Sequence, residues 1–381
     1  MPVPTAWIEQ AAPPMAEAAE RDLEALVCVS SPSADLEAAE RIVAVAAAMA
    51  PPGAAVERLP CSTAEHAPDL LLTVAGTGTC RILLVGHLDT VVGHDDHLAP
   101  RRSGSHLIGP GSYDMKGGDA IALALLAVLD GHPGLAEASL LLVNDEEWRT
   151  GPFGHVGRFS GFDACLCFEG GMRDADGRDA VVVRRKAAGA LRIRARGRAA
   201  HSGSAPELGA NALLALADVA RVVDGCSDPG GPDRLTAVPT IMSAGQALNV
   251  VPPDGELVCD LRADRAEAFE AVEAAIPARV GEVSIEVARD RQWPGMDSRE
   301  ASAPVLARAS ESLGRPVVGG ERGGASDASH FAGSIPVVID GLGPLGGNAH
   351  HPDEYVELPL LGRCEVALAV AGAILESPKN P

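Results

Sequence analysis

Five residues of the chain carry side chains that commonly bind metal ions, and nearly all of them stand at the end of an apolar segment. Imidazole nitrogens mixed with hard carboxylate oxygens form a ligand set that suits zinc, cobalt or manganese. The set needs no cysteine. The sequence therefore predicts a metal centre built from histidine and carboxylate ligands. The five candidates are His87, Asp114, Glu147, Glu169 and His350.

His87 ends the apolar segment RILLVGH, and Asp89 follows it two residues later. The carboxyl ends of strands are where open α/β sheets place their sites. In the metal interpretation, one ring nitrogen of His87 binds the ion while Asp89 orients the ring. A surface histidine beside a turn aspartate would give the same spacing, so this pair is weak evidence alone.

Asp114 lies in the loop GPGSYDMKGG, whose glycines allow a tight turn and a close backbone approach. A carboxylate in such a loop can bridge two metal ions. The competing interpretation is an aspartate that only caps the helix expected from Met115. Glu169 repeats the pattern, because it ends the apolar run ACLCF before two glycines.

The segment ASLLLVND runs directly into Glu146 and Glu147. Adjacent residues of an extended chain point to opposite sides, so one glutamate can bind a metal while the other acts as general base on a metal-bound water. Solvated charges after a strand are the alternative. The last candidate, His350 in GGNAHHPDEYVE, has His351 as a neighbour, and spacing alone does not choose between them.

Charge balance favours two ions over one. Two divalent ions bring four positive charges, which three carboxylates and one bridging hydroxide would neutralise. A single ion would leave surplus carboxylate charge in a buried place, at a large desolvation cost.

The elements that must position these residues alternate along the chain. Helical periodicity is expected near 15–29 and 115–129, and the serine cluster Ser30, Ser31, Pro32 and Ser33 is expected to end the first helix and cap a second one that runs through Met49. Strand-like apolar runs surround 70–76, 81–90 and 138–145. This order indicates an α/β catalytic domain with a mixed, largely parallel sheet flanked by helices. The pattern changes near Arg184 and returns near Gln292, which predicts an inserted smaller α+β domain. The expected bounds are 1–186 and 292–381 for the catalytic domain and 187–291 for the insert.

Composition limits the possible partners. The 381 residues are 46% hydrophobic and 22% charged, as in folded proteins, and the net charge of −21 disfavours nucleic acid and anionic membranes. The N-terminal segment lacks the basic and unbroken apolar regions of a signal peptide, and no segment has the length of a membrane span. The eight cysteines are scattered, mostly in apolar runs. We therefore expect a cytoplasmic protein with reduced thiols.

Motifs along nearly the whole chain resemble the zinc metallopeptidase family that includes acetylornithine deacetylase, succinyl-diaminopimelate desuccinylase, aminoacylases and glutamate carboxypeptidase. They follow the order of that family, and SAPELGANAL with ERGGASDAS favours the glutamate carboxypeptidase branch. The motifs are GHLDTV, GPGSYDMKGG, NDEEW, CFEGG, RGRAAHSGSAPELGANAL, ALNVVPP and AHHPDEYV.

The resemblance implies two Zn²⁺ per subunit, with Co²⁺ or Mn²⁺ as substitutes. One zinc would bind to His87, Asp114 and Glu169, and the other to Asp114, Glu147 and His350. It also implies that Glu146 is the general base, that Asp89 orients His87, and that a cis peptide follows Asp114. His350 is preferred over His351 because it stands where the ligand of the family precedes DEYV.

The inserted domain resembles the lid of the family, which mediates homodimerisation in many members. By this resemblance His201 would stabilise the oxyanion, in its own or the partner subunit's site, and Asn249 would assist it. Arg262 would bind the free carboxylate of the substrate through its planar fork. Gly324, in ERGGASDAS, is a further expected substrate contact; the alternative is that this glycine only makes a turn.

The implied reaction is hydrolysis of an amide by a metal-bridging hydroxide. The expected substrate is a small N-acyl or peptidyl amino acid with a free carboxylate, and the alternative is an N-acetyl or N-succinyl diamino acid. A non-catalytic metal-binding scaffold is the remote alternative. Three residues depart from the usual motifs, and we expect them to reshape the pocket: Tyr113, Trp148 and Arg149.

Overall fold

The computed structural model describes residues 5–376, which form two compact units. The first unit contains the described residues up to Arg184, Asp297–Glu321 and those from Ser326 onward. The second contains Arg185–Met296 and Arg322–Ala325, and the proposed insert of residues 187–291 falls within it. The first unit is thus assembled from segments far apart in the sequence.

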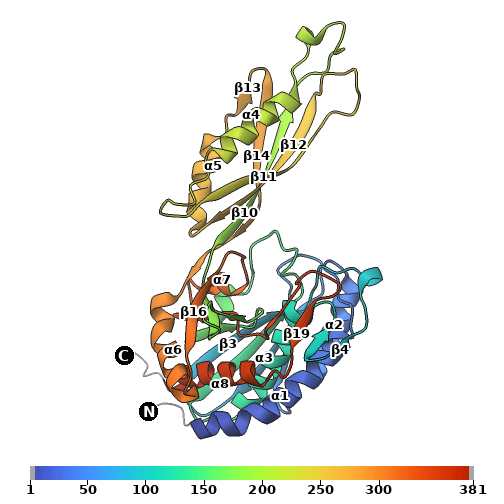
Figure 1. Cartoon of the computed structure of the whole chain (residues 1–381). Helices are drawn as coiled ribbons and strands as arrows, with labels where there is room; N and C mark the ends of the chain where they lie inside the picture. The colour runs from blue at the N-terminus through green and yellow to red at the C-terminus, as the bar shows by residue number, and fades with distance from the viewer. Residues whose placement is uncertain (1–4, 377–381) are drawn as a thin grey trace. The chain divides into compact units, whose positions relative to one another are not determined.

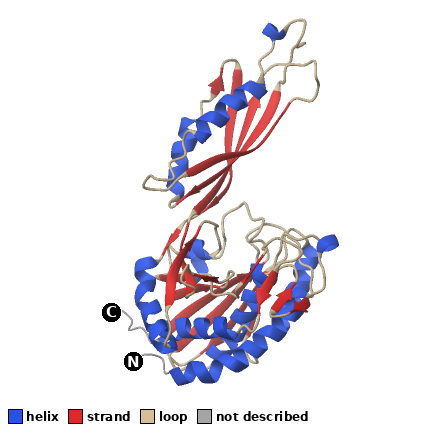
Figure 2. Ribbon diagram, in the orientation of Figure 1, coloured by secondary structure: helices blue, strands red, loops and turns tan. Residues whose placement is uncertain are grey.

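A six-stranded mixed sheet forms the centre of the first unit (Figures 1 and 2). Strands β6, β3, β7 and β17 run parallel, while β1 and β2 join the β6 edge in antiparallel fashion. This is the predicted mixed, largely parallel sheet. In spatial order its strands are β1 (Ala55–Leu59), β2 (Asp69–Ala75), β6 (Leu135–Val143), β3 (Cys80–His87), β7 (Ala164–Cys167) and β17 (Val337–Ile339).

Helices supply the rest of this core. Helix α1 packs against α3 and α8, and α8 packs against α6. Because the chain has only 3% aromatic residues, alanine, leucine and valine fill the interior, and almost every residue of α3 and α8 is buried. The helices are α1 (Thr5–Val27), α2 (Leu36–Ala48), α3 (Gly117–Leu129), α6 (Arg299–Leu313), α7 (Ala328–Phe331) and α8 (Leu361–Leu375).

The chain also forms two smaller sheets. One pairs short strands in the order β18-β19-β5-β4, and the other has the order β15-β9-β16, with β8 also paired to β9. Their bounds are β4 (Arg101–Ser103), β5 (His106–Ile108), β8 (Met172–Arg173), β9 (Asp179–Arg185), β15 (Met296–Asp297), β16 (Val317–Arg322), β18 (Gly346–Gly347) and β19 (Tyr355–Glu357).

The second unit is a five-stranded antiparallel sheet covered by two helices (Figure 2). In β10 the residues from Leu191 onward alternate between buried and more exposed, so the sheet has one apolar face, and this face packs against α4 and α5. In spatial order the strands are β11 (Thr236–Ala244), β12 (Asp254–Ala263), β10 (Ala187–Arg196), β14 (Val283–Trp293) and β13 (Arg279–Val280). The helices are α4 (Ala212–Asp224) and α5 (Phe269–Ala275).

Some expectations about individual elements were wrong. The serine cluster does not cap α2; Asp35 does, accepting a hydrogen bond from the Ala38 N–H at 2.8 Å. Strand β11 was not predicted, because Pro239 interrupts its sequence. The structure places β11 at the sheet edge with a register shift just after this proline, where a residue without an N–H is tolerated. Among the described residues, no helix combines the length and apolarity needed to cross a membrane.

Candidate active site

Two groups of metal-binding side chains meet at the carboxyl end of the central sheet. Strand β3 ends at His87, and β6 and β7 run parallel to it, so the loops after all three strands open at the same edge. One group is His87, Asp114 and Glu169, and the other is Asp114, Glu147 and His350. Within each group one ligand atom per residue lies within 4.8 Å of the others. Asp114 belongs to both groups, as a bridging ligand would.

The distances between these atoms fit metal ligands. Nε2 of His87 lies 3.2 Å from Oδ1 of Asp114, and Nε2 of His350 lies 3.3 Å from the other oxygen, Oδ2. Ligand atoms about 2.0 Å from a tetrahedral zinc are roughly 3.3 Å apart. Oε1 of Glu147 is 3.1 Å from His350 Nε2, so these two atoms are close enough to bind the same ion. The donor set and its spacing therefore fit two divalent ions.

The electrostatics of the residues alone also favour bound cations. Burial raises the pKa of Glu146 well above its usual value, and the nearby carboxylates of Glu169 and Asp327 add to the rise. Hydrogen bonds to Asp114 and Glu147 raise the pKa of His350 to about 10. Glu146 and His350 thus both favour their protonated forms beside these carboxylates, and divalent ions would supply positive charge at the same place.

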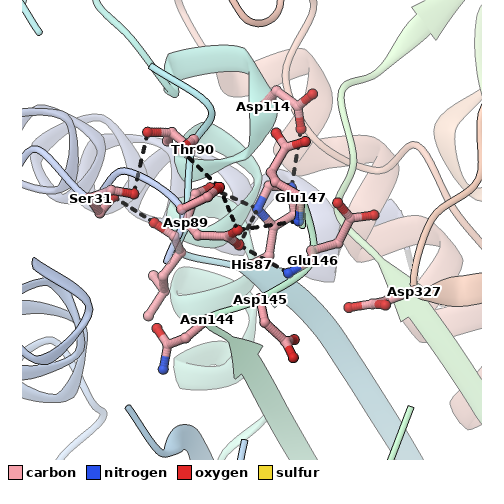
Figure 3. A network of polar contacts seen from close by, with 12 residues as sticks. Ser31, His87, Asp89, Thr90, Asp114, Asn144, Asp145, Glu146, Glu147 and Asp327 are labelled. Atoms are coloured by element: carbon pink, nitrogen blue, oxygen red, sulfur yellow. Dashed lines mark hydrogen bonds and ion pairs between the residues drawn. The ribbon is translucent and has the colours of Figure 1, made fainter. Parts of the chain in front are cut away.

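Asp89 organises two sides of the site (Figure 3). Nδ1 of His87 lies 3.0 Å from the backbone oxygen of Asp89 and 3.4 Å from its carboxylate. The same carboxylate accepts the backbone N–H groups of Glu146 and Glu147, both at 3.2 Å, and the hydroxyl of Ser33 at 3.1 Å. Asp89 therefore contacts the His87 ring and also holds the backbone of the two glutamates.

Glu146 and Glu147 do not lie in extended chain, so the expectation that they alternate across a strand was wrong. They lie in a turn after β6, which a hydrogen bond from the Arg149 N–H to the Asp145 carbonyl closes at 2.8 Å. Glu147 enters the second metal group, whereas Glu146 belongs to neither. Glu146 is 8% exposed and lies beside the candidate metal ligands His87, Asp114 and Glu147 (Figure 3).

Sequence reasoning missed Glu354. Its carboxylate accepts three backbone N–H groups of the Asp114 loop, from Gly111 at 2.9 Å, Tyr113 at 2.6 Å and Asp114 at 2.7 Å. Glu354 is the fourth residue after His350, so it connects the Asp114 loop to the segment that carries His350. The acidic DEYV motif was a signal, but it does not reveal a partner 240 residues away.

The environment of Asp114 explains one departure from the family motifs. The peptide bond from Asp114 to Met115 is cis, as the resemblance implied. The hydroxyl of Tyr113 donates to the Gly171 carbonyl at 3.2 Å. A Cβ atom at Gly170 would lie 2.2 Å from the Tyr113 ring, so this glycine makes room for the aromatic side chain. Tyr113 therefore packs against the loop that follows Glu169.

The structure separates the two neighbouring histidines. His350 has a φ of +67° and points Nε2 at Asp114 and Glu147. His351 instead accepts the Asp353 N–H on Nδ1 at 3.1 Å and belongs to neither metal group. This geometry favours His350 as the ligand.

The other expected site residues belong to the second unit. Nδ1 of His201 accepts the N–H groups of Gly203 and Ser204, both at 3.2 Å, so the ring proton of the neutral form resides on Nε2. His201 is exposed and lies beside Asn249, whose carbonyl accepts the Ser202 N–H at 3.0 Å. The structure therefore brings His201 and Asn249 together and leaves an imidazole donor accessible.

Arg262 and Gly324 already have partners in this unit. The guanidinium of Arg262 pairs with Asp260 on the same strand, with Nη2 at 3.0 Å from Oδ1. The carbonyl of Gly324 accepts a hydrogen bond from Nη1 of the buried Arg185 at 2.8 Å. A substrate carboxylate would have to compete with Asp260 for Arg262.

Comparison with known proteins identifies the family. The model of peptidase family M20/M25/M40 matches residues 83–376. The chain belongs to this family. It is therefore a metal-dependent hydrolase of the M20 type rather than a non-catalytic scaffold. The matched region spans all five candidate ligands.

Relatives of this M20 enzyme include two enzymes of known name. It is 30% identical over 309 residues to carboxypeptidase G2 from Pseudomonas sp. (strain RS-16), a match that covers 76% of this chain and 72% of that protein. It is 29% identical over 360 residues to succinyl-diaminopimelate desuccinylase from Methylorubrum extorquens (strain PA1), which covers 85% and 90% of the two chains. The fold is similar to that of the aminopeptidase PepT from Bacillus cereus ATCC 10987, with a TM-score of 0.74 and 21% identity over 94% and 98% of the chains.

Proposed function

We propose that this M20 enzyme hydrolyses the amide bond of an N-acyl or peptidyl amino acid with a free carboxylate, using two zinc ions. The observation that carries the proposal is the pair of ligand groups that share Asp114. The similarity to carboxypeptidase G2 supports the carboxypeptidase-like reading of the substrate. His87, Asp114 and Glu169 would hold one ion, and Asp114, Glu147 and His350 the other. Co²⁺ or Mn²⁺ would fit the same donors.

Glu146 is the proposed general base. When bound, the two cations would polarise the scissile carbonyl and lower the pKa of the attacking water. Glu146 takes a proton from this water as its oxygen attacks the carbonyl carbon. The glutamate then passes the proton to the leaving amine, whose bond to the carbonyl carbon breaks. Asp89 keeps Glu146 in place because its carboxylate accepts the backbone N–H of Glu146.

His201 is the proposed oxyanion donor. Its Nδ1 accepts two backbone N–H groups, so Nε2–H is free to donate to the negative oxygen of the tetrahedral intermediate. Asn249, next to it, would assist. Arg262 would exchange its pairing with Asp260 for the substrate carboxylate, since the Arg262 side chain is 35% exposed and accessible to a ligand. Gly324 is proposed as a backbone contact to the substrate.

We also propose a homodimer through the second unit. Strand β11 is an edge strand of its sheet, and it carries the exposed apolar side chains of Val238, Ile241 and Met242. Leu213 and Leu214 of α4 are exposed as well. Exposed edges with apolar side chains favour pairing with another chain. Sedimentation equilibrium would test this proposal, with Ile241→Lys expected to shift a dimer toward monomer.

The experiment that tests the function combines a substrate panel with one substitution. N-acyl-glutamates and glutamyl dipeptides should be cleaved faster than N-acetyl-ornithine or N-succinyl-diaminopimelate. Glu146→Ala should retain the metal content of the wild type while kcat falls by roughly 10²–10⁴-fold. A Glu146→Ala enzyme with most of its activity would refute the role of this residue.

The alternative is a desuccinylase-like or deacetylase-like enzyme acting on a diamino acid. The match to succinyl-diaminopimelate desuccinylase over 85% of this chain and 90% of that protein favours it. The same panel separates the two proposals. Preferential cleavage of N-succinyl-diaminopimelate or N-acetyl-ornithine would replace the carboxypeptidase assignment.

A further inference from the structure

The turn that carries Glu146 and Glu147 is closed twice by the same residue. The Arg149 N–H donates to the Asp145 carbonyl at 2.8 Å, and the Arg149 guanidinium donates Nη1–H to Oδ1 of Asp145 at 2.6 Å. Backbone and side chain of Arg149 therefore both connect the two ends of a five-residue segment. The two glutamates lie between these ends.

Arg149 also ties the turn to a distant part of the first unit. Its Nη2 donates to Oδ1 of Asp327, which directly precedes α7 and is 178 residues away in the sequence. On the other side of the turn, Oδ2 of Asp145 accepts the backbone N–H of Thr63 at 2.8 Å and its hydroxyl at 2.7 Å. The turn is thus anchored on two sides, and one of these anchors is Arg149.

The environment of Arg149 holds its guanidinium in one place. The side chain is fully buried, as is that of Asp145, and the side chain of Asp327 is 3% exposed. The Phe153 ring covers the guanidinium, with its centroid 4.4 Å from Cζ. A fully buried guanidinium held by two carboxylates is unavailable to substrate. The sequence expectation that Arg149 reshapes the substrate pocket was therefore wrong.

The charges explain why a cation is needed at this position. The carboxylates of Asp327 and Glu146 lie near each other, as Figure 3 shows. The second carboxylate oxygen of Asp327 is buried and accepts no hydrogen bond from any described residue. Without the Arg149 charge, Asp327 would be a buried anion beside Glu146, and repulsion would favour moving one of them.

We infer that Arg149 is a positioning residue for the general base: through its ion pairs with Asp145 and Asp327 it holds the turn so that Glu146 stays in reach of the attacking water. This inference rests on the proposed function of Glu146. Arg149 acts through the turn and does not touch substrate. Its loss should therefore lower kcat more than it alters KM or metal binding.

The test compares three variants at the Arg149 position. Arg149→Met removes the charge and keeps much of the length, Arg149→Lys keeps the charge but not the fork, and Arg149→Met with Asp327→Asn removes both charges of the pair. For each we would measure zinc per chain, thermal midpoint, kcat, KM and amide hydrogen exchange of Glu146–Arg149.

A matched control is Arg81→Met. Arg81 has the same kinds of partner, with Nη2 2.9 Å from Oε2 of Glu137 and Cζ 4.2 Å from the Phe162 ring centroid, but its side chain is 38% exposed. It stands near the start of β3, whereas His87 ends that strand. Arg81→Met should leave kcat and the exchange of the turn unchanged.

The expected result is a fall in kcat of roughly 10–100-fold in Arg149→Met, with KM and zinc content close to the wild type and faster exchange in the turn. Arg149→Lys should lie between Arg149→Met and the wild type. The double variant should regain part of the thermal stability because Asp327 no longer carries an unpaired charge, while Asp145 keeps its hydrogen bonds from Thr63. Its kcat should stay low and its exchange fast, since the ion pairs of Arg149 that hold the turn are absent.

Three results would overturn the inference. The first is wild-type kcat in Arg149→Met, and the second is recovery of kcat together with stability in the double variant, which would make Arg149 only a stabilising residue. The third is loss of zinc in proportion to kcat. If the wild type cleaves nothing in the panel, the proposed function fails, while exchange in the turn still decides whether Arg149 positions it. Unchanged exchange in Arg149→Met would refute the inference in that case.

Discussion

Charged residues around the metal centre and those of the second-unit sheet find their partners in opposite ways. Arg149 is fully buried and reaches Asp327, 178 residues away. Arg196 on β10 is 63% exposed and pairs with Glu286 on the adjacent strand β14 at 3.6 Å. Burial without water makes ion pairs directional and costly to break, whereas exposed pairs are screened and flexible. The buried ion pairs of Arg149 therefore fix the positions of side chains, whereas the exposed pair of Arg196 contributes little to the free energy of folding.

Of the substitutions that test the contrast between buried and exposed charges, Glu354→Ala should have the largest effect. Glu354→Ala removes the acceptor of three N–H groups in the Asp114 loop, so this loop loses its support. We expect zinc affinity to fall by roughly 10–100-fold, as is typical when groups that orient ligands are lost. Titration with a competing chelator measures this change. Glu357→Ala, an exposed position on the same β19 segment, is the control and should bind zinc normally.

The buried carboxylate of Asp69 should give the next largest effect, as a pH dependence. Burial raises the pKa of Asp69 to about 6, above its usual 3.8, although its contact with His155 at 2.7 Å opposes the rise. The folded state therefore binds this proton more tightly than the unfolded state. Asp69 therefore contributes about 1–3 kcal/mol to the free energy of unfolding below about pH 4, and this contribution is lost as the pH rises through 6.

Asp69→Asn should make the free energy of unfolding less dependent on pH between pH 4 and 6, as measured by urea denaturation of the metal-free protein. Glu256 in the second unit should have the opposite pH dependence. Hydrogen bonds from Arg194 and Arg192 lower the pKa of Glu256 despite weak opposition from burial, so its contribution is present above about pH 4.5 and is lost on acidification. An unchanged pH dependence in Asp69→Asn would show that burial does not set the behaviour of this carboxylate.

The smallest effect is expected in the second-unit sheet. Arg196→Ala should change the free energy of unfolding by no more than about 0.5 kcal/mol, because both members of its ion pair are more than half exposed. Thermal unfolding at low and high salt measures it. A loss of several kcal/mol would show that the exposed ion pairs of the second unit matter as much as the buried ones of the first.

The same distinction explains what the sequence could predict. The fold class and the candidates His87, Glu147 and Glu169 follow from apolar segments that end in a histidine or carboxylate, a pattern that is local in the sequence. Asp114 was predicted from its glycine-rich loop, and only the family resemblance favoured His350 over His351. Glu354 was missed, and the contacts of Arg149 were not foreseen, because their partners lie 240 and 178 residues away. Glu146 and Glu147 were expected in extended chain because the preceding apolar run predicts a strand. The hydrogen bond from the Arg149 N–H to the Asp145 carbonyl, which forms their turn, has no recognisable pattern in the sequence.

Metal stoichiometry tests the central claim most directly. The account predicts two zinc ions per chain in the wild type. It predicts one in Glu169→Ala and one in His350→Ala, since each removes a ligand of a single group, and none held tightly in Asp114→Ala, which removes the shared ligand. Mass spectrometry of the native protein and elemental analysis would count the ions. A single zinc in the wild type, or two retained in Asp114→Ala, would contradict a metal pair bridged by Asp114.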